Sequence, residues 1–178
     1  MLRLFVALDL PDEIRAALAA LEVDEDVWRR VDPAALHVTL AFLGSRPPED
    51  VDVIAPVLAA EAEAPPLALG DVLLLPPRRA RVLTVELHDP AHALRALQRR
   101  VSAGLQAAGV YEPETRPYRA HVTIARLRPR VPAPREAKER IEARTFHGEA
   151  VTLYVSRLHP KGARYEALAR APLGYIQP

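Results

Sequence analysis

The sequence contains no cysteine and only two lysines. Without cysteine the chain has no disulfide framework and no thiolate metal site, so its stability must come from packing, and thiol redox chemistry is excluded. Its net charge of +1 is too small to attract nucleic acid by itself. The basic residues are nearly all arginines, which can bind phosphate through paired N–H groups, although a general composition bias is the favoured explanation for them.

Long apolar runs are also lacking. No apolar stretch reaches the roughly 20 residues that span a bilayer, and the N-terminus has none of the features of a signal peptide. We therefore expect a cytoplasmic protein. The 178 residues, 49% of them apolar, suffice for a sizeable core. No glycine-rich phosphate loop follows the first apolar run, which removes the main support for a nucleotide-binding doubly wound fold.

Apolar runs and helical periodicities follow the same order twice along the chain, which indicates an internal duplication. The expected order in the first half is strand 2–10, helix 12–21, strand 36–43, helix 49–62 and strand 67–75. The expected order in the second half is strand 81–87, helix 91–108, strand 118–127, a short helix at 136–143, strand 148–158 and an edge strand at 165–169.

This alternation is compatible with a parallel doubly wound sheet and with an α+β fold. We expect the α+β fold, because duplicated halves can pair around a pseudo-two-fold axis and face each other across a cleft. The expectation is one domain over residues 1–178 with two lobes, built from halves of about 1–76 and 77–178. Each half is expected to hold an antiparallel sheet and two helices.

Each half contains the same tripeptide at the same place. His37-Val38-Thr39 and His121-Val122-Thr123 both lie in the strand that follows the first helix of their half. With six histidines and six threonines, His-x-Thr is expected by chance about 0.2 times in this chain. Two copies at matching places of a repeat are therefore hard to attribute to accident.

The two tripeptides suit phosphoryl transfer. On a strand, residues two apart share a face, so the histidine and threonine of each copy project together. The residues expected to point into the core are Val38, Leu40, Val122 and Ile124. Without a metal, phosphodiester hydrolysis needs one group to deprotonate the attacking oxygen and another to protonate the leaving oxygen, which two imidazoles can do near neutral pH. Threonine hydroxyls can donate to phosphate oxygens.

Two other interpretations stay open at this point. Taken alone, a histidine on a strand is usually a satisfied or exposed side chain without a catalytic role, and threonine is a common strand residue. A zinc site is a further alternative, but it lacks a third histidine or a carboxylate at motif spacing.

The two motifs resemble those of a known family. His37-Val38-Thr39-Leu40 and His121-Val122-Thr123-Ile124 look like the paired H-x-T-x motifs of the two-histidine (2H) phosphoesterases, and most of all those of RNA 2′,3′-cyclic phosphodiesterases, also called 2′-5′ RNA ligases. The flanks that match are 3–9, Phe42-Leu43-Gly44, 77–82, Ala125-Arg126, Ser156-Arg157-Leu158 and Tyr165-Glu166. One departure is Tyr118-Arg119-Ala120-His121, where many relatives have Phe-x-Pro-His; it leaves the start of that strand open.

The resemblance implies a bilobal α+β fold with the active site between the lobes, no metal or other cofactor, and hydrolysis of the cyclic phosphate to a 2′-phosphomonoester. It makes His37 and His121 the acid and base pair, and Thr39 and Thr123 the phosphate-binding residues. The implied substrates are RNA ends or nucleotides with a 2′,3′-cyclic phosphate. We expect a monomer without a membrane partner.

Three further residues are candidates for substrate binding. The resemblance implies a phosphate or ribose contact for Arg126, but strict alternation points it away from Thr123, and a bulge would be needed to bring it round. A surface arginine is the alternative. Phe42 can stack on a base, although core packing is its favoured role. Tyr118 can stack on a base or pack against the protein.

Several other residues are assigned structural or surface roles. A basic cluster of three arginines could meet an RNA backbone or lie in a solvated loop. These are Arg78, Arg79 and Arg81. The single tryptophan, Trp28, is expected to cover the core. The four histidines outside the repeated pattern are His88, His92, His147 and His159.

Two rival functions remain. One is 2′-5′ ligation of RNA, or hydrolysis of a small cyclic nucleotide, by the same residues. The other is a nucleotide- or RNA-binding module that keeps the cleft without catalysis, although a binder has no need for two proton-transfer groups.

Overall fold

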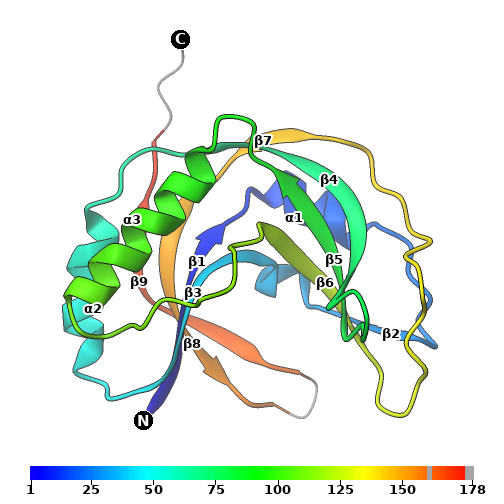
Figure 1. Ribbon diagram of the computed structural model, residues 1–178, viewed down its shortest axis with the longest axis horizontal. Coiled ribbons are helices and arrows are strands. Elements are labelled where there is room, and N and C mark those ends of the chain that lie inside the picture. The colour runs from blue at the N-terminus through cyan, green and yellow to red at the C-terminus, as the bar shows by residue number, and fades with distance from the viewer. Residues whose placement is uncertain (160–161, 175–178) are drawn as a thin grey trace.

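The computed structural model describes residues 1–159 and 162–174. These residues form an α+β fold of three α-helices and one curled sheet of nine strands (Figure 1). In chain order the elements are β1 Leu2–Asp9, α1 Asp12–Ala19, β2 Trp28–Arg30, β3 His37–Arg46, α2 Asp50–Ala59, β4 Pro66–Leu75, β5 Val82–His88, α3 Ala93–Ala107, β6 His121–Leu127, β7 Thr145–His147, β8 Ala150–Arg157 and β9 Arg164–Pro172. A short 3-10 turn, Pro33–Ala35, precedes β3.

All described strand pairs are antiparallel, in the order β7-β4-β5-β6-β3-β1-β8-β9, with β2 added on β6. The centre of this order is β6 against β3, and these strands share the single registered pair Val38–Val122. The strands on either side of this pair form two lobes. Because the lobes are joined over such a short ladder, the strands diverge and leave room for a cleft.

The lobes exchange strands between the two halves of the chain. β4 comes from the first half but pairs with β5, and β8 comes from the second half but pairs with β1. Each lobe thus takes strands from both sides of residue 76. The division into halves of about 1–76 and 77–178 stays a prediction about the sequence repeat, while the lobes are built from both halves.

The helices α2 and α3 pack together beside the lobe that contains β1 and β3, whereas α1 lies in the part of Figure 1 occupied by β4 and β5. The buried face of α3 consists of apolar residues three or four positions apart, the period of one helical face. These residues are Leu94, Leu97, Val101 and Leu105. Gly104 allows α2 to approach closely, since a Cβ there would meet Val57 Cγ1 at 2.6 Å.

The α+β architecture and most expected elements are confirmed, but the helix expected at 136–143 does not form. This segment runs beside β4 without regular structure, and two of its three apolar residues, Ala137 and Ile141, pack against the core. Eight residues are too few to stabilise a helix without strong tertiary packing. The strand expected from residue 118 begins at His121, and the edge strand is longer than expected. Trp28 is buried, as expected.

None of the described helices is both long and apolar enough to cross a membrane.

Candidate active site

The register of β3 and β6 places the two motifs side by side. Val38 and Val122 are paired and fully buried. Continuing this antiparallel register puts His37 across from Thr123, and places Thr39 across from His121. Side chains alternate along a strand, so these four lie on the face opposite the two valines. The four predicted residues are therefore brought together between the lobes, related by a pseudo-two-fold axis at the valine pair.

Both histidines have the same hydrogen-bonded tautomer. Nδ1 of His37 donates to the carbonyl of Ala35 at 2.7 Å, and Nδ1 of His121 donates to the carbonyl of Arg119 at 2.8 Å. A carbonyl can only accept, so Nδ1 carries the proton and Nε2 of the neutral ring has a free lone pair. Nε2 of His37 lies 3.1 Å from Thr39 Oγ1, which can donate to it. The first motif thus presents the lone pair of Nε2 beside a hydroxyl, and the Nδ1 hydrogen bond leaves Nε2 as the ring nitrogen of His121 that can face a substrate.

The ring of His37 is packed among aromatic side chains. Its centroid lies 4.9 Å from that of Phe5 and 5.4 Å from that of Tyr165, which meets it edge-on. Burial of this ring lowers the pKa of His37 below its ordinary value of 6.5, and the positive charges of Arg126 and Arg15 lower it further. The hydrogen bond to Ala35 and the charge of Asp9 act in the opposite direction. The free site therefore holds His37 neutral at neutral pH.

A bulge follows each motif at the same position. The register of β3 against β1 shifts between Thr39 and Ala41, and that of β6 against β5 shifts between Thr123 and Ala125. The residues left over, Leu40 and Ile124, are both buried. A bulge of this kind moves the following side chains to the other face of the strand. The side chain five residues after each histidine is consequently returned to the face of the motif.

Arg126 occupies that position in the second copy. It is exposed, and its charge acts on His37 from the neighbouring strand. The bulge that alternation alone required is therefore present. Arg126 lies where its guanidinium can serve the same anion as the two motifs.

Phe42 occupies the equivalent position in the first copy, and its favoured role in core packing is wrong. Its side chain is 61% exposed, because the bulge turns it away from the core. Its ring lies 6.2 Å from that of Phe5. Phe42 thus presents an aromatic face to the cleft.

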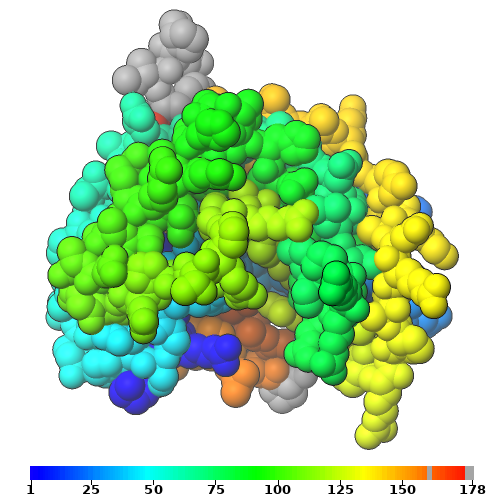
Figure 2. Space-filling view, in the orientation of Figure 1, coloured from blue at the N-terminus to red at the C-terminus, as the bar shows by residue number. Residues whose placement is uncertain are grey.

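A cavity of about 650 Å³ opens beside the motifs, between α3, the loop before β6 and the turn between β4 and β5. Thr39, Phe42, Tyr118 and His121 line it. In Figure 2 the yellow-green atoms of the segment before β6 lie between α3 on the left and the β4–β5 turn on the right. Tyr118 packs into this wall rather than standing free, and its hydroxyl donates to the carbonyl of Thr39 at 3.2 Å. Burial raises the pKa of Tyr118, so its phenol stays protonated.

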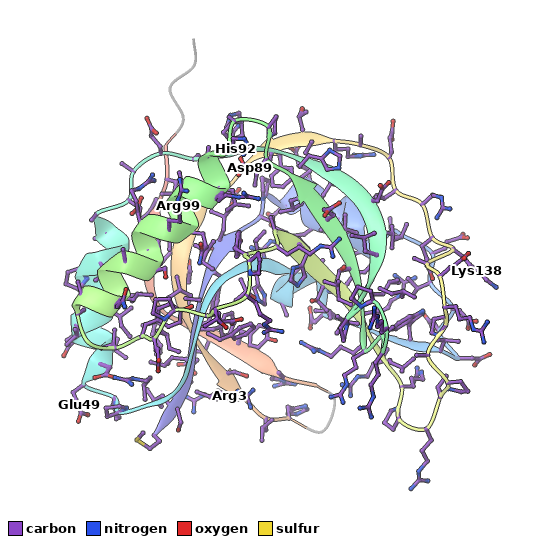
Figure 3. All side chains as sticks on the ribbon, in the orientation of Figure 1. Arg3, Glu49, Asp89, His92, Arg99 and Lys138 are labelled. Carbon is purple, nitrogen blue, oxygen red and sulfur yellow. The ribbon has the colours of Figure 1, made fainter. Side chains whose placement is uncertain are left out.

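The other predicted surface residues lie outside the motif face. Arg78, Arg79 and Arg81 are exposed in the β4–β5 turn, and of these Arg81 lines the cavity. His92 lies beside Asp89 at the start of α3 (Figure 3). His88 is exposed at the end of β5. Within residues 1–159 and 162–174, no group of three or more His, Cys, Asp or Glu side chains is arranged to hold a metal ion.

Sequence reasoning missed the surroundings of His37. The sequence predicted no functional role for Asp9, yet this residue pairs with His37 in the register of β1 and β3. Tyr154 on β8 stacks on Phe5 and donates a hydrogen bond to Asp9. The available signal was the repeat itself: β5 places Glu86 opposite His121, as β1 places Asp9 opposite His37.

The comparisons with known proteins agree with this geometry. The model of the 2′-5′ RNA ligase superfamily matches residues 10–160. A curated protein of Thermus thermophilus, named RNA 2′,3′-cyclic phosphodiesterase, is 32% identical over 97% of this chain and 90% of its own length. A protein of the same name from Escherichia coli is 30% identical over 70% of this chain and 71% of its own.

Solved structures show the same fold. A crystal structure of a Thermus thermophilus protein superimposes with a TM-score of 0.81 at 28% identity, covering 98% of this chain and all of that one. The crystal structure of Escherichia coli LigT complexed with 3′-AMP gives a TM-score of 0.76 at 27% identity, covering 97% and 98% of the two chains. With its two H-x-T-x motifs paired across one central seam, this chain belongs to the 2′-5′ RNA ligase superfamily of 2H phosphoesterases.

Proposed function

We propose that this protein hydrolyses RNA 2′,3′-cyclic phosphate ends to 2′-phosphomonoesters, with His37 and His121 as its proton-transfer groups and without a metal. The observation that carries the proposal is the Val38–Val122 register, which sets both His-Thr pairs on one face. Curated relatives named RNA 2′,3′-cyclic phosphodiesterase support the reaction. The site contains a candidate for each role that metal-independent hydrolysis needs.

The reaction uses both imidazoles. The oxygen of a water molecule forms a bond to phosphorus while its proton passes to Nε2 of one histidine. The bond from phosphorus to O3′ breaks, and the other histidine, which enters this step protonated on both ring nitrogens, gives its Nε2 proton to O3′. The product has a phosphate on O2′ and a hydroxyl on C3′. Exchange with solvent then returns each ring to its starting protonation state.

The different surroundings of the rings divide these roles. Burial lowers the pKa of His37, so its Nε2 is unprotonated at neutral pH and can accept the proton of water. The hydrogen bond of His121 lies at an exposed position, whereas that of His37 is partly buried. We assign His37 as the general base and His121 as the general acid.

Charge on the phosphate is held by the remaining groups of the motif face. The hydroxyls of Thr39 and Thr123 donate to the non-bridging oxygens, whose charge grows in the transition state. Arg126 adds a charge-assisted donor on the same face. Thr39 is already within 3.1 Å of the proposed base, which keeps its hydroxyl next to the reacting phosphate.

The nucleoside fits the cavity on the His121 side. Phe42 offers an exposed aromatic face at its edge, and base–aromatic stacking contributes about 1–3 kcal/mol per base. Tyr118 forms part of the wall and fixes the backbone of Thr39. The crystal structure of the Escherichia coli relative with 3′-AMP supports a nucleotide ligand for this fold.

The same arrangement supports 2′-5′ ligation, the activity in the family's name. In that reaction the 5′-hydroxyl of a second RNA takes the place of water, and His37 deprotonates it instead. A monomer is supported by the fact that one chain supplies both motifs. The cytoplasmic location stays a prediction.

The product formed from an RNA with a cyclic phosphate end tests the proposal. We expect a 2′-phosphomonoester, with slower turnover of a cyclic mononucleotide and with ligated product only when a 5′-hydroxyl RNA is added. Binding of the cyclic RNA without any product would support the binding-module alternative. Preferential turnover of the mononucleotide would assign a small cyclic nucleotide as the substrate.

A further inference from the structure

Each motif histidine lies directly opposite a carboxylate residue on an adjacent strand. Asp9 of β1 pairs with His37, and Glu86 of β5 pairs with His121. The positions are equivalent, because the residues leading to them match as well: Ala7 faces Thr39, and Thr84 faces Thr123. The duplication therefore places one acid beside each imidazole.

The two acids lie in different surroundings. Asp9 is only 4% exposed, whereas the side chain of Glu86 is 34% exposed and is paired with Arg119 at 3.3 Å. A buried carboxylate is costly unless donors satisfy it. The carboxylate of Asp9 has a complete set of donors, which Glu86 lacks among the described contacts.

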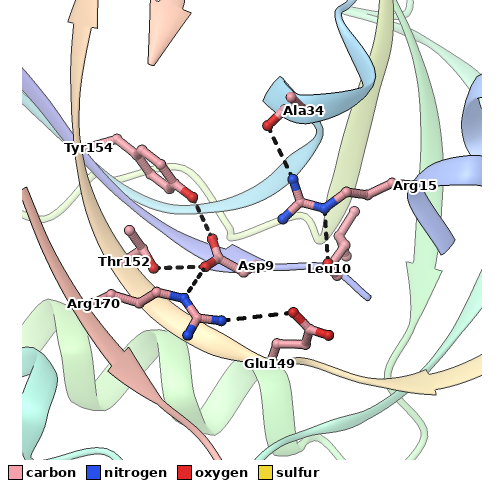
Figure 4. Close-up of polar contacts among 8 residues, drawn as sticks. All are labelled: Asp9, Leu10, Arg15, Ala34, Glu149, Thr152, Tyr154 and Arg170. Atoms are coloured by element: carbon pink, nitrogen blue, oxygen red, sulfur yellow. Dashed lines mark hydrogen bonds and ion pairs between the residues drawn. The ribbon is translucent and has the colours of Figure 1, made fainter. Parts of the chain in front are cut away.

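Three side chains from two strands hold the Asp9 carboxylate (Figure 4). Tyr154 donates to Oδ1 at 2.8 Å, Thr152 donates to Oδ2 at 2.8 Å, and Arg170 donates to Oδ2 at 3.2 Å. Such an arrangement fixes the orientation of the carboxylate and compensates the burial of its charge. The charge of Asp9 is therefore kept beside His37 in a region of low solvent access.

The hydrogen bond from Tyr154 also ties Asp9 to the ring packing of His37. The Tyr154 ring stacks on Phe5 at 5.4 Å and lies 6.5 Å from the His37 ring. Burial of Tyr154, together with its hydrogen bond to Asp9, raises its pKa to about 12, so the phenol donates throughout the physiological range. Asp9 thus acts on His37 through its charge and is hydrogen-bonded to a ring that lies near His37.

We propose that Asp9 is a positioning residue for His37: its fixed carboxylate compensates the charge that His37 acquires on accepting a proton, and it holds Tyr154 in the aromatic wall of the site. This inference rests on the proposed function of His37 as a base. Without Asp9, a base enclosed by aromatic rings and two cations would have no anion beside it. Glu86 is more exposed and is already paired with Arg119, so its carboxylate compensates a charge on His121 less strongly.

Charged and titratable groups from several elements face this region and enter any pH dependence. The groups whose charge acts on His37 are Asp9 from β1, Arg15 from α1 and Arg126 from β6. Tyr154 from β8 and Tyr165 from β9 pack near the ring, and Arg170 from β9 acts through Asp9. Among the described residues, Asp9 is the only acid whose charge acts on His37.

The experiment compares Asp9→Asn with the matched variant Glu86→Gln, which removes a charge at the equivalent position. The pKa of His37 is measured by NMR titration of its imidazole, and kcat/KM for the cyclic RNA is measured across the acidic pH range. Because the charge of Asp9 raises the pKa of His37, Asp9→Asn is expected to lower it and to move the acidic limb of kcat/KM to lower pH. Glu86→Gln should leave both unchanged.

The direction in which the pKa of His37 shifts separates a positioning role of Asp9 from a purely structural one. If Asp9 only held the fold, its loss would let water reach His37, and the pKa would rise towards its ordinary value. A rise or no change in Asp9→Asn, or an equal shift in Glu86→Gln, would overturn the proposal. Asp9→Glu, which keeps the charge, should restore the His37 titration more fully than it restores kcat.

Two further measurements keep the outcomes distinct. If Asp9→Asn does not fold, Arg170→Gln removes the half-exposed cation from Asp9, and the less compensated carboxylate should then raise the pKa of His37. An unchanged titration in that variant would overturn the proposal. The NMR titration does not depend on turnover, so an inactive wild-type protein would contradict the proposed function while the test of Asp9 still gives its answer.

Discussion

Phe42 and Arg126 occupy the same position in the two halves of the molecule, each five residues after a motif histidine and each returned to the cleft by a bulge. One offers an aromatic face and the other a guanidinium. The duplication thus supplies two equivalent places, and the different side chains make one end of the cleft aromatic and the other cationic. A substrate with a base on one side of its phosphate fits this asymmetry in one direction.

Replacing Arg126 by glutamine should weaken catalysis and change its pH dependence. Loss of a charge-assisted hydrogen bond, worth about 1.5–3 kcal/mol, lowers kcat/KM by roughly 10- to 150-fold. The charge of Arg126 lowers the pKa of His37, so the acidic limb of kcat/KM should move to higher pH in the variant. Arg29, the exposed neighbour of Arg126 on β2, provides the control. Equal effects of Arg29→Gln would contradict the assignment.

Replacing Phe42 by alanine should raise KM without destabilising the fold. Lost stacking of about 1–3 kcal/mol corresponds to a rise of roughly 5- to 150-fold. The side chain is already 61% exposed, so we expect little change in Tm. Val53, 44% exposed on α2, is the matched control for removal of a surface apolar group. A large drop in Tm with unchanged KM would show that Phe42 serves packing after all.

Replacing either His37 or His121 by alanine should lower kcat by about 10²- to 10⁴-fold while nucleotide binding remains measurable. A substrate in which sulfur replaces the bridging 3′ oxygen separates the roles, because a thiolate leaves without protonation. This substrate should restore turnover to His121→Ala and leave His37→Ala inactive. The reverse pattern would exchange the acid and the base, and full activity in both variants would contradict the site.

Replacing Tyr118 by phenylalanine should reduce stability by about 1 kcal/mol, the usual net contribution of one hydrogen bond. The lost bond is the one from the Tyr118 hydroxyl to the carbonyl of Thr39. Since burial raises the pKa of Tyr118, its ionisation should produce no alkaline limb in kcat/KM below about pH 10 in the wild type. Chemical denaturation measures the first effect and a pH profile the second. An alkaline limb that disappears in Tyr118→Phe would assign the phenol a proton-transfer role.

Chelators such as EDTA should leave hydrolysis unchanged, because two imidazoles supply the base and the acid. Activity is measured before and after exhaustive dialysis against the chelator. A loss that added zinc reverses would support the zinc-site interpretation of the two histidines.

Much of the site followed from the sequence alone. The His-x-Thr tripeptide is repeated after the first helix of each half. Because side chains on a strand alternate with a period of two, this repeat predicted which residues share a face. Val38 and Val122 are fully buried, as expected. These inferences are local, because alternation and helical periodicity depend only on neighbouring residues. The family prediction rested on the same motifs and is confirmed by the family model.

Features that depend on contacts between distant segments could not be predicted. The bulges after Thr39 and Thr123 depend on how β3 fits β1 and how β6 fits β5, and these bulges decide where Phe42 and Arg126 point. The absence of a helix at 136–143 has a similar origin, because a segment of only eight residues depends on tertiary packing to become helical, and its sequence does not report that packing.

The sequence by itself determined which groups the two central strands carry, namely two imidazoles and two hydroxyls on the face opposite two buried valines. The tertiary structure decided how these groups differ. Exchange of β4 and β8 between the lobes brings Thr152 and Tyr154 to Asp9, and burial against Phe5 and Tyr165 lowers the pKa of His37. Desolvation and charge act through space, so identical tripeptides acquire different properties only once the chain has folded.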